Sequence, residues 1–600
     1  PFSVPMNDPL KSLEGSIASA IQWAVQSEFG FSMELPVLQL TRREFSGTYT
    51  WVAFGVAKTV GIPPDEVGQV VGKQLINNCQ LVKDFNIVKG FLNVELADEA
   101  WVSMWNALQV HSYGVSQIRE DEPAAMVEYS SPNTNKPLHL GHVRNNLLGH
   151  SVSELIKATG KKVVKVQIIN DRGIHICKSM LAWKKFGAGE TPESSGTKGD
   201  HLVGKYYVAF DRAYREEMAA LVASGRTEDQ AKVEAPLMRE AQEMLRLWED
   251  GDAAVMNLWR TMNQWVYAGF EATYRRLGVS FDKNYYESET YVLGKQDVER
   301  GLALGVFYRK DDGSVWIDLR PDGLDEKVVL RSDGTSVYMT QDLGTAVQRF
   351  LDFNIDSLTY VVGNEQDYHF KVLFLILKKL GYAWAHQLVH LSYGMVDLPN
   401  GRMKSREGSV VDADDLLSEM ETTAAQLSEE LGKLEGMPEA DKAALYRTLG
   451  HGALKYFILK VDPTKRMVFN PEESVDFNGN TGPFLQYTHA RIASLLRKAG
   501  NRQPVAAEGY AWDPRETEAV FQLAQFPRTV QQAADARNPA VVANYVYELV
   551  KSFNGLYQNL SILNADHPEQ VALRVALAER VGYVVRTGLG FLGITAPDRM

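Results

Sequence analysis

Hydrophobic and polar positions divide the chain into regions of different periodicity. Near the N-terminus, SIASAIQWAVQSEFG and GQVVGKQLINN repeat apolar residues at helical spacing, and PVLQL indicates a short strand. VKDFNIVKGFLNVEL alternates like two strands joined at Lys89-Gly90. The charged segment IREDEP then marks a boundary. Residues 1–118 are therefore predicted to form an α+β domain.

From Ala124 onward, strands alternate with helices. MVEYS, the amphipathic helix after His142 and KKVVKVQIIN form one β-α-β unit, which predicts parallel strands with a right-handed crossover. A polar stretch and long helices interrupt this pattern before strands resume near VVLRSDG, SLTYVVG and QLVHLSYG. We expect an α/β domain over residues 119–412, with a parallel sheet and a helical insertion over about 187–326.

The rest of the chain is predicted to be helical. TGPFLQYTHARIASLLRKAG and NPAVVANYVYELVKSFNGLYQNLSIL are strongly amphipathic. We expect a helical stem or linker region over residues 413–470 and an all-α domain over 471–600. At 600 residues the chain is too long for a single core, so the predicted fold class is multidomain.

Composition and charge add only broad limits. No apolar run approaches the ~20 residues that a membrane span needs, so no membrane association is expected. Two cysteines exclude a disulfide framework and favour a cytoplasmic location. The net charge of −12 argues weakly against nucleic acid as a partner, although a local basic patch can still bind RNA.

The segment SPNTNKPLHLGH, residues 131–142, carries the clearest chemical signal. It lies where a strand gives way to a helix, whose first N–H groups are unpaired and attract phosphate. Gly141 has no Cβ and would let a flat ring or a phosphate approach the backbone. His139 and His142 would donate to charge that grows on a phosphate in a transition state. A zinc pair is the alternative, but no H-E-x-x-H pattern or cysteine cluster accompanies it.

This segment resembles the HIGH signature of class I aminoacyl-tRNA synthetases, here His139-Leu140-Gly141-His142. The resemblance implies a Rossmann-type catalytic domain that binds ATP at this turn. The segment GRMKSREG, residues 401–408, resembles the second signature, KMSKS, on a loop whose cations neutralise the leaving pyrophosphate. A solvated charged turn is the alternative for this loop. Ser405 stands where the signature has its second lysine.

This departure from KMSKS resembles that of the arginyl-tRNA synthetases. In that family, a lysine just before HIGH supplies the positive charge that the second KMSKS lysine would otherwise provide. Lys136 occupies this place here. The resemblance implies catalytic roles for His139, His142, Lys136, Lys404 and Arg406. It also implies ATP contacts from His139, Gly141, His142, Met403 and Ser405, and from Tyr393, Met395 and Val396, which would flank adenine.

Arginine recognition requires carboxylates, because a guanidinium is always charged and donates in a planar fork. Three polar clusters at expected strand ends resemble the arginine pocket of this family. The resemblance assigns the guanidinium to Tyr338 and Asp342, which would share one face of a helix start. The other expected arginine-binding residues are Glu128, Ser130, Asn133 and Gln366. For each residue alone, a helix cap or a strand-end hydrogen bond is the alternative.

Further resemblances concern tRNA. GFLNVEL resembles the end of the N-terminal domain that contacts the tRNA D-loop, which implies contacts from Phe91 and Asn93; a hairpin core is the alternative. QYTHAR and GLGFLGITAPDRM resemble the start and end of the anticodon-binding domain. Tyr547, Phe553 and Tyr557 could stack on bases there, although helix-core packing is the alternative. We expect tRNA contacts from Tyr547, Tyr557 and Met600.

The resemblance as a whole implies an arginine–tRNA ligase. Arginine's carboxylate would attack the α-phosphate of ATP, and the 2′-hydroxyl of the terminal adenosine of tRNA(Arg) would then take the arginyl group. Mg²⁺ would arrive with ATP, with no structural metal, and the usual monomer is expected. Two alternatives are a small-molecule adenylyltransferase, which is usually shorter and lacks the C-terminal helices, and a non-catalytic RNA-binding relative, which is expected to lack the two histidines.

Overall fold

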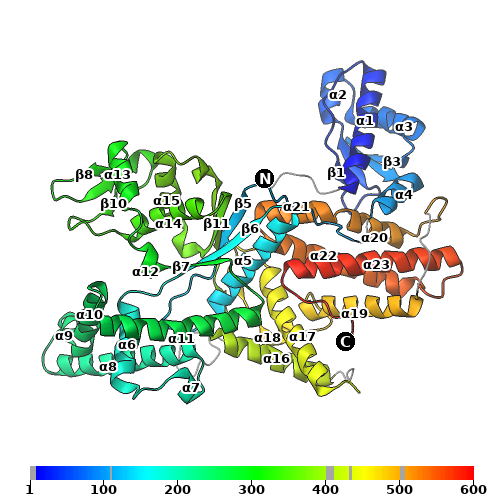
Figure 1. The fold of residues 1–600 in the computed structure, drawn as a ribbon. Helices are drawn as coiled ribbons and strands as arrows, with labels where there is room; N and C mark the ends of the chain where they lie inside the picture. Colours follow the sequence, from blue (N-terminus) through cyan, green and yellow to red (C-terminus); the bar gives the residue numbers. More distant parts are fainter. Residues whose placement is uncertain (1–7, 109–110, 400–410, 431–435, 501–506) are drawn as a thin grey trace.

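A computed structural model of the chain describes residues 8–108, 111–399, 411–430, 436–500 and 507–600. Figure 1 shows a central sheet with two lobes on one side, a helical bundle on the other, and an N-terminal domain beside the bundle. This arrangement confirms the predicted multidomain fold class, with an α+β, an α/β and an all-α part.

The N-terminal domain packs helices against a four-stranded sheet of order β1-β2-β4-β3. The predicted strand pair is confirmed, because β3 and β4 pair antiparallel through a turn in which Lys89 and Gly90 both have positive φ. PVLQL contributes only a two-residue strand. The elements are α1 (Pro9–Phe29), β1 (Gln39–Leu40), β2 (Tyr49–Val52), α2 (Phe54–Val60), α3 (Pro64–Asn78), β3 (Val82–Val88), β4 (Phe91–Leu96) and α4 (Asp98–Ala107).

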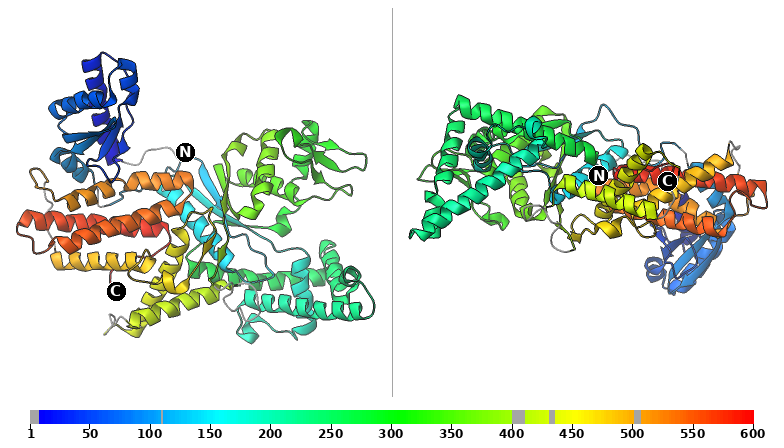
Figure 2. Two further views of the ribbon diagram at one scale, coloured as in Figure 1. Left: turned by 180° about the vertical axis from the view of Figure 1, so that it is seen from behind. Right: turned by 90° about the horizontal axis from the view of Figure 1, so that it is seen from below.

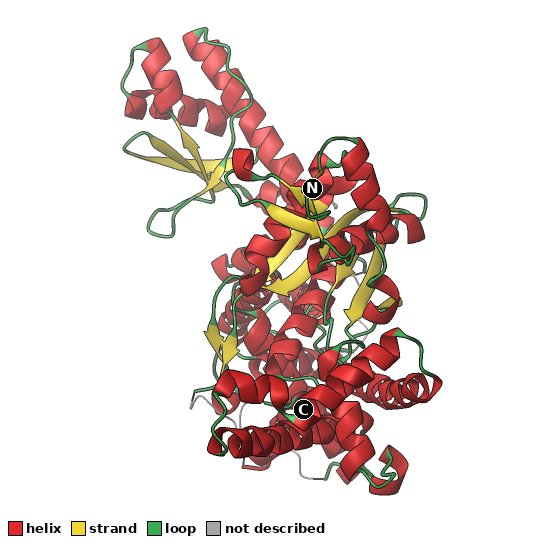
Figure 3. Cartoon of the chain, turned by 90° about the vertical axis from the view of Figure 1, so that its left-hand side faces the viewer, coloured by secondary structure: helices red, strands yellow, loops and turns green. Residues whose placement is uncertain are grey.

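The central sheet has five parallel strands in the order β12-β11-β5-β6-β7. Figure 3 shows these strands, in yellow, between helices. Every residue of the central strand β5 is buried, as a strand covered on both faces requires. The strands are β5 (Ala124–Glu128), β6 (Val163–Ile169), β7 (Lys283–Tyr286), β11 (Ile355–Gly363) and β12 (Leu388–Tyr393), and the adjoining helices are α5 (Leu140–Ala158), α14 (Tyr338–Asp352), η2 (Asn364–Gln366), α15 (Asp367–Lys379) and η3 (Ala383–Gln387).

One lobe is the helical insertion between β6 and β7. It contains α6 (Ile174–Phe186), α7 (Pro192–Ser195), α8 (Gly199–Ala223), α9 (Glu228–Glu234), α10 (Pro236–Glu249) and α11 (Ala253–Leu277). The expected range of about 187–326 overran this insertion, because β7 already rejoins the parallel sheet within it. β7 reads KNYY, which has no apolar run, and Asp282 fixes its register by exchanging hydrogen bonds with the Lys165 backbone.

The other lobe holds a separate antiparallel sheet of order β10-β9-β8. The run VVLRSDG was expected to continue the central sheet, but it supplies β10 of this small sheet instead. Periodicity identifies a strand without identifying its partner. The elements are α12 (Glu287–Thr290), α13 (Lys295–Ala303), β8 (Tyr308–Arg309), β9 (Val315–Ile317), η1 (Arg320–Asp322) and β10 (Lys327–Leu330).

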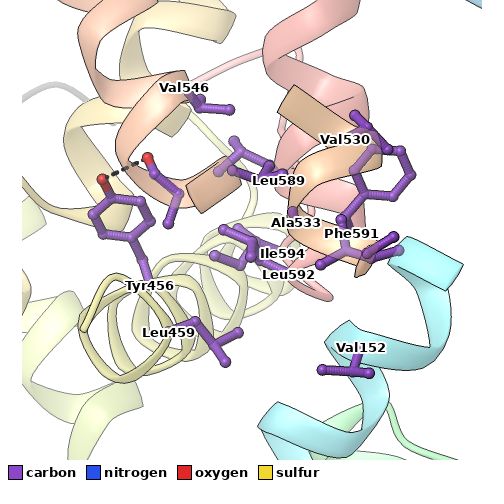
Figure 4. Packing of buried hydrophobic residues seen from close by; sticks show 14 of the residues in the cluster. Val152, Tyr456, Leu459, Val530, Ala533, Val546, Leu589, Phe591, Leu592 and Ile594 are labelled. Carbon is purple, nitrogen blue, oxygen red and sulfur yellow. Dashed lines mark hydrogen bonds between the residues drawn. The ribbon is translucent and has the colours of Figure 1, made fainter. Parts of the chain in front are cut away.

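The C-terminal third is a helical bundle, apart from the short pair β13 (Val396–Asp397) and β14 (Met467–Val468). Figure 4 shows α5, which carries Val152, beside this bundle, and Val152 belongs to the same buried cluster as Leu459 of α17 and Ala533 of α21. The two parts thus share one hydrophobic core. The helices are α16 (Ala413–Glu430), α17 (Glu439–Leu459), α18 (Pro471–Ser474), α19 (Gly482–Ala499), α20 (Pro514–Ala524), α21 (Phe526–Ala536), α22 (Pro539–Asn559) and α23 (Pro568–Phe591).

The N-terminal domain docks on the bundle, as both views in Figure 2 show. The Trp105 and Trp512 rings lie edge to face at 6.3 Å, and the Arg580 guanidinium lies 3.9 Å from the Trp105 ring centre. Arg528 adds ion pairs to Asp8 and Glu14. Within the described ranges, no helix has the length and apolar composition that a membrane crossing requires.

Candidate active site

A strained turn follows β5 at the carboxyl edge of the sheet. Ser130 and Ser131 both have positive φ, at 71° and 48°, which residues with a Cβ rarely adopt. The Ser130 N–H donates to Asn145 Oδ1 at 2.5 Å, and Asn145 Nδ2 donates to the Val361 carbonyl at 2.7 Å and to the Tyr393 hydroxyl at 3.1 Å. Asn145 of α5 therefore ties the ends of β5, β11 and β12 together.

His139 and His142 form the N-terminal cap of α5. The Gly141 N–H donates to His139 Nδ1 at 3.0 Å, and the His139 N–H donates to His142 Nδ1 at 3.2 Å. Since each Nδ1 accepts, each neutral ring carries its proton on Nε2. Burial lowers the pKa of His139 to about 4 and that of His142 below its usual range, with Lys136 acting in the same direction. The cap thus presents two neutral imidazoles.

Gly141 lies against the ring of His139. A Cβ at this position would lie 2.8 Å from His139 Cε1 and 3.0 Å from His139 Nδ1. The His139 ring therefore packs directly against Gly141, on the side where a side chain would lie. A side chain here would push His139 out of the cap.

A cavity of about 420 Å³ brings together four of the six residues expected to bind arginine: Glu128, Tyr338, Asp342 and Gln366. Asp342 Oδ2 lies 2.6 Å from His369 Nε2, and the Asp342 side chain is 43% exposed. Tyr338 and Asp342 lie one turn apart in α14, which confirms their shared helix start, although that start follows the small sheet and not a strand of the central sheet. Asp342 is thus a carboxylate that a ligand in the cavity can reach.

Glu128 already has a counter-charge within the protein. Its carboxylate pairs with the Arg349 guanidinium, and both side chains are buried. Burial raises the pKa of Glu128, while Arg349 opposes this rise. Arg349 also lies 5.3 Å and 5.5 Å from the ring centres of Tyr285 and Tyr360. The sequence pattern missed Arg349, although a basic residue on the face of α14 that carries Leu343 and Ala346 was a usable signal.

Ser130 and Asn133 do not line this cavity. The Ser130 hydroxyl lies 2.8 Å from the Tyr274 hydroxyl, so its role is structural in this arrangement. Asn133 is exposed and lines a neighbouring cavity of about 640 Å³, together with Lys136. Tyr338 lines both cavities and is 74% exposed. The expectation grouped these residues because they follow strand ends, but a position at a strand end does not tell which of the two cavities a residue lines.

The residues expected to flank adenine lie at the end of β12, where Tyr393 is the last residue, and directly after it. Arg144 is completely buried, and its Nη1 donates to the carbonyls of Gly394 at 2.5 Å and Met395 at 3.2 Å. Met395 itself is 51% exposed, and Val396 lies in β13. Arg144 was not predicted, but a charged residue two positions after the HIGH signature, in a buried helix, was a signal for it. Through Arg144, α5 fixes the backbone around Tyr393, Met395 and Val396.

The second signature lies outside the described residues, so Met403, Lys404, Ser405 and Arg406 have no structural account. The chain after it pairs with the first signature. The Leu140 N–H donates to the Val411 carbonyl, and the Ala413 N–H donates to the Leu138 carbonyl, each at 2.9 Å. His139 and Asp412 face each other in this antiparallel bridge. The segment that follows the second signature is thus hydrogen-bonded to the first signature through the backbone.

Comparisons with known proteins agree with this geometry. The family described as tRNA synthetases class I (R), catalytic domain, matches residues 104–470. The chain belongs to the arginyl-tRNA synthetase family. The DALR anticodon binding domain matches residues 485–600.

Individual arginyl-tRNA synthetases match over nearly the whole chain. An arginine–tRNA ligase from Flavobacterium psychrophilum is 56% identical over 98% of this chain and 100% of its own length. One from Bacteroides thetaiotaomicron is 54% identical over 94% of this chain and 95% of its own. The structure of Thermus thermophilus arginyl-tRNA synthetase has a TM-score of 0.78 at 26% identity and covers 98% of this chain and 100% of that one.

The residues expected to contact tRNA in an arginyl-tRNA synthetase lie in different environments. Phe91 is half-buried at the end of the β3–β4 hairpin, 5.6 Å from the Phe54 ring. Asn93 is buried: its Oδ1 accepts from Thr50 at 2.6 Å and its Nδ2 donates to Asn86 at 2.8 Å. A tRNA contact was expected from Asn93, but its side-chain amide is hydrogen-bonded within the sheet and is not available for that contact.

In the bundle, Phe553 is fully buried, so this residue packs in the helical core, as the alternative interpretation expected. Tyr557 is 38% exposed, and the Arg491 guanidinium lies 5.2 Å from its ring centre. Tyr547 is half-buried and lies 6.0 Å from the Phe484 ring. Met600 packs against a small cluster that includes Leu445 and Leu449 of α17. Of this set, Tyr557 offers the most accessible aromatic face.

Proposed function

We propose that this protein is an arginine–tRNA ligase, which forms arginyl-adenylate from L-arginine and ATP and transfers the arginyl group to tRNA(Arg). The observation that carries the proposal is the meeting, at one edge of the sheet, of a carboxylate-bearing cavity and a helix N-terminus capped by two neutral histidines. The family match and the DALR domain support the same activity.

Arginine is held mainly by Asp342. Its carboxylate reaches the cavity, whereas Glu128 is neutralised by Arg349. The guanidinium donates to Asp342 beside the Tyr338 ring, a charge-assisted contact that a neutral side chain cannot reproduce. Glu128 acts through its own ion pair to shape the wall, and Gln366 lies near the α-amino and carboxylate end. Asn133 contacts substrate from the larger cavity, and Ser130 supports the turn.

Adenylate formation needs charge stabilisation and no protein nucleophile. The carboxylate oxygen of arginine attacks the α-phosphorus of ATP, and the bond to pyrophosphate breaks. His139 and His142 donate Nε2–H to the phosphate, at a helix N-terminus that favours anions. Lys136, Lys404 and Arg406 neutralise the leaving pyrophosphate, and Mg²⁺ accompanies ATP as part of the substrate. Gly141, Tyr393, Met395, Val396, Met403 and Ser405 complete the ATP site.

Transfer follows at the same edge of the sheet. The 2′-hydroxyl of the terminal adenosine attacks the acyl carbon, and AMP leaves. Phe91, Tyr547, Tyr557 and Met600 are proposed tRNA contacts, and Asn93 supports the hairpin through its hydrogen bonds to Thr50 and Asn86. The two free cysteines, Cys79 and Cys177, are both buried, which supports action in the reducing cytoplasm. We infer that the protein acts as a monomer.

The decisive experiment is aminoacylation with arginine, ATP and tRNA(Arg), comparing wild type with Asp342→Ala. Removing the accessible carboxylate should weaken arginine binding by about 2–5 kcal/mol, the usual effect of leaving a charge unpaired. The matched control is Asp322→Ala, which loses only an ion pair to Lys379. Absence of arginylation by the wild type would refute the function, and an unchanged KM for arginine in Asp342→Ala would refute the pocket.

A further inference from the structure

The helical insertion contacts the HIGH segment directly. A Cβ on Gly204 of α8 would lie 2.8 Å from Pro137 Cδ, so the helix and this segment are in close contact. Tyr207, three residues on, lines the larger cavity with Lys136. The start of α8 therefore lies beside the residues that lead into His139.

Asp412 joins this insertion to the segment that pairs with His139. Its Oδ1 caps α16 by accepting from the N–H groups of Asp414 at 2.8 Å and Asp415 at 3.1 Å. Its Oδ2 lies 3.1 Å from His201 Nε2, on α8. One carboxylate thus fixes the start of α16 and binds the insertion at the point where the backbone bridges His139.

Asp414 makes a second connection to the insertion. Its carboxylate accepts from Lys198 Nζ at 2.6 Å and from Arg276 Nη1 at 3.1 Å. Asp200, His201 and Asp414 place ligand atoms within 4.8 Å of one another, as a metal site would. Lys198 Nζ, however, lies 2.9 Å from Asp200 and 2.6 Å from Asp414, so an ammonium of the protein already lies among these carboxylates.

We propose that His201 and Lys198 of the insertion are positioning residues for adenylate formation. By holding Asp412 and Asp414, they keep the segment 411–413 against residues 138–140 and so fix the His139–His142 cap. This inference rests on the proposed function, since the cap must act on ATP. The pKa of His201 is raised to about 10 by the nearby carboxylates of Asp412 and Asp414, which lie 3.1 Å and 3.5 Å from its Nε2, and this keeps the side chain charged at neutral pH.

The test compares steady-state arginylation by wild type, His201→Ala and His201→Gln. Loosening the cap should lower kcat about tenfold or more, because small displacements of catalytic groups cost large factors in rate. KM for arginine should stay within about twofold, since the Asp342 cavity is lined by other residues. Glutamine keeps a donor near the Nε2 position and should restore most of the lost kcat.

The matched control is His451→Ala. His451 Nε2 lies 2.8 Å from Glu421 of α16, so it is also a histidine–carboxylate pair on this helix, but it lies away from residues 138–140. This variant should lose thermal stability without the fall in kcat. Asp412→Asn, which can keep the α16 cap through Oδ1, should repeat the kcat loss and serves if His201→Ala does not fold.

Three outcomes would overturn the inference: wild-type kcat in both His201→Ala and Asp412→Asn, an equal fall of kcat in His451→Ala, or a KM for arginine that rises in parallel with the loss of kcat. A wild-type protein that fails to charge tRNA would instead defeat the proposed function. The two failures are therefore distinguishable within one set of assays.

Discussion

Arg349 and Glu128 form a buried ion pair, in which each charge is stabilised by the other. Arg349→Met would leave a buried carboxylate without its counter-charge, which typically costs about 3–5 kcal/mol. Thermal unfolding followed by circular dichroism should show a lowered midpoint for the sheet domain. The double variant Arg349→Met/Glu128→Met should recover most of the loss, because an apolar pair replaces both charges. Arg300→Met, on an exposed helix surface, is the control. A double variant less stable than Arg349→Met would contradict this account.

The protonated His201 side chain should stabilise the folded protein less and less as the pH rises above neutrality. Its pKa is about 10 in the folded protein against an ordinary value of 6.5, so the folded state binds the proton more tightly. This stabilisation is complete below pH 6.5 and is lost as the pH rises toward 10. The difference in melting temperature between wild type and His201→Gln should therefore shrink between pH 6.5 and 10. A difference that stays constant over this window would exclude the contribution.

Single residues also show where sequence reasoning reached its limit. His139 and His142 could be placed at a helix start from the local pattern, whereas Asp342 and Gln366 were identified through the resemblance to the arginine pocket of the family. Asn145, Arg144 and Arg349 act through partners that are distant in sequence, on β11, after β12 and on β5. No local period specifies such partners, although a buried polar residue in a packed helix indicates that one exists.

At the scale of elements, α5 depends on close packing against β5. A Cβ on Gly149 would lie 2.1 Å from Tyr129 Cγ, so Gly149→Ala should destabilise the sheet domain by about 1–3 kcal/mol through overpacking. Gly555→Ala, in α22, meets no atom within 4 Å and should stabilise its helix by about 0.5–1 kcal/mol. Differential scanning calorimetry of both variants gives the comparison. Similar midpoints for the two would contradict the packing explanation.

Strand identity was less predictable than helix identity. β5, β6 and β11 carry apolar runs and were located correctly, while β7 is a short polar edge strand held by Asp282. β10 has the right pattern, but it pairs with β9 in another sheet. Pairing partners are set by the packing of whole lobes, which alternation along one strand does not encode.

At the scale of the molecule, one helix connects the proposed catalytic cap to the bundle. α5 begins at the His139–His142 cap and packs further along against α17, α21, α22 and α23. The N-terminal domain docks on the same bundle through Arg528 and Trp105. A tRNA that contacts the N-terminal domain and the bundle therefore acts on elements that share a core with α5.

From this connection, together with the family resemblance, we predict that arginine-dependent ATP–pyrophosphate exchange requires tRNA. If the free protein rarely adopts the arrangement of the active site that can react, binding of tRNA over a large surface can shift the population toward that arrangement. Exchange should be near background with arginine and ATP alone and should appear when tRNA(Arg) is added. tRNA with an oxidised terminal ribose cannot accept arginine, so exchange in its presence would show that binding suffices. Robust exchange without any tRNA would mean that the His139–His142 cap is already competent, and that the shared core transmits nothing that activation needs.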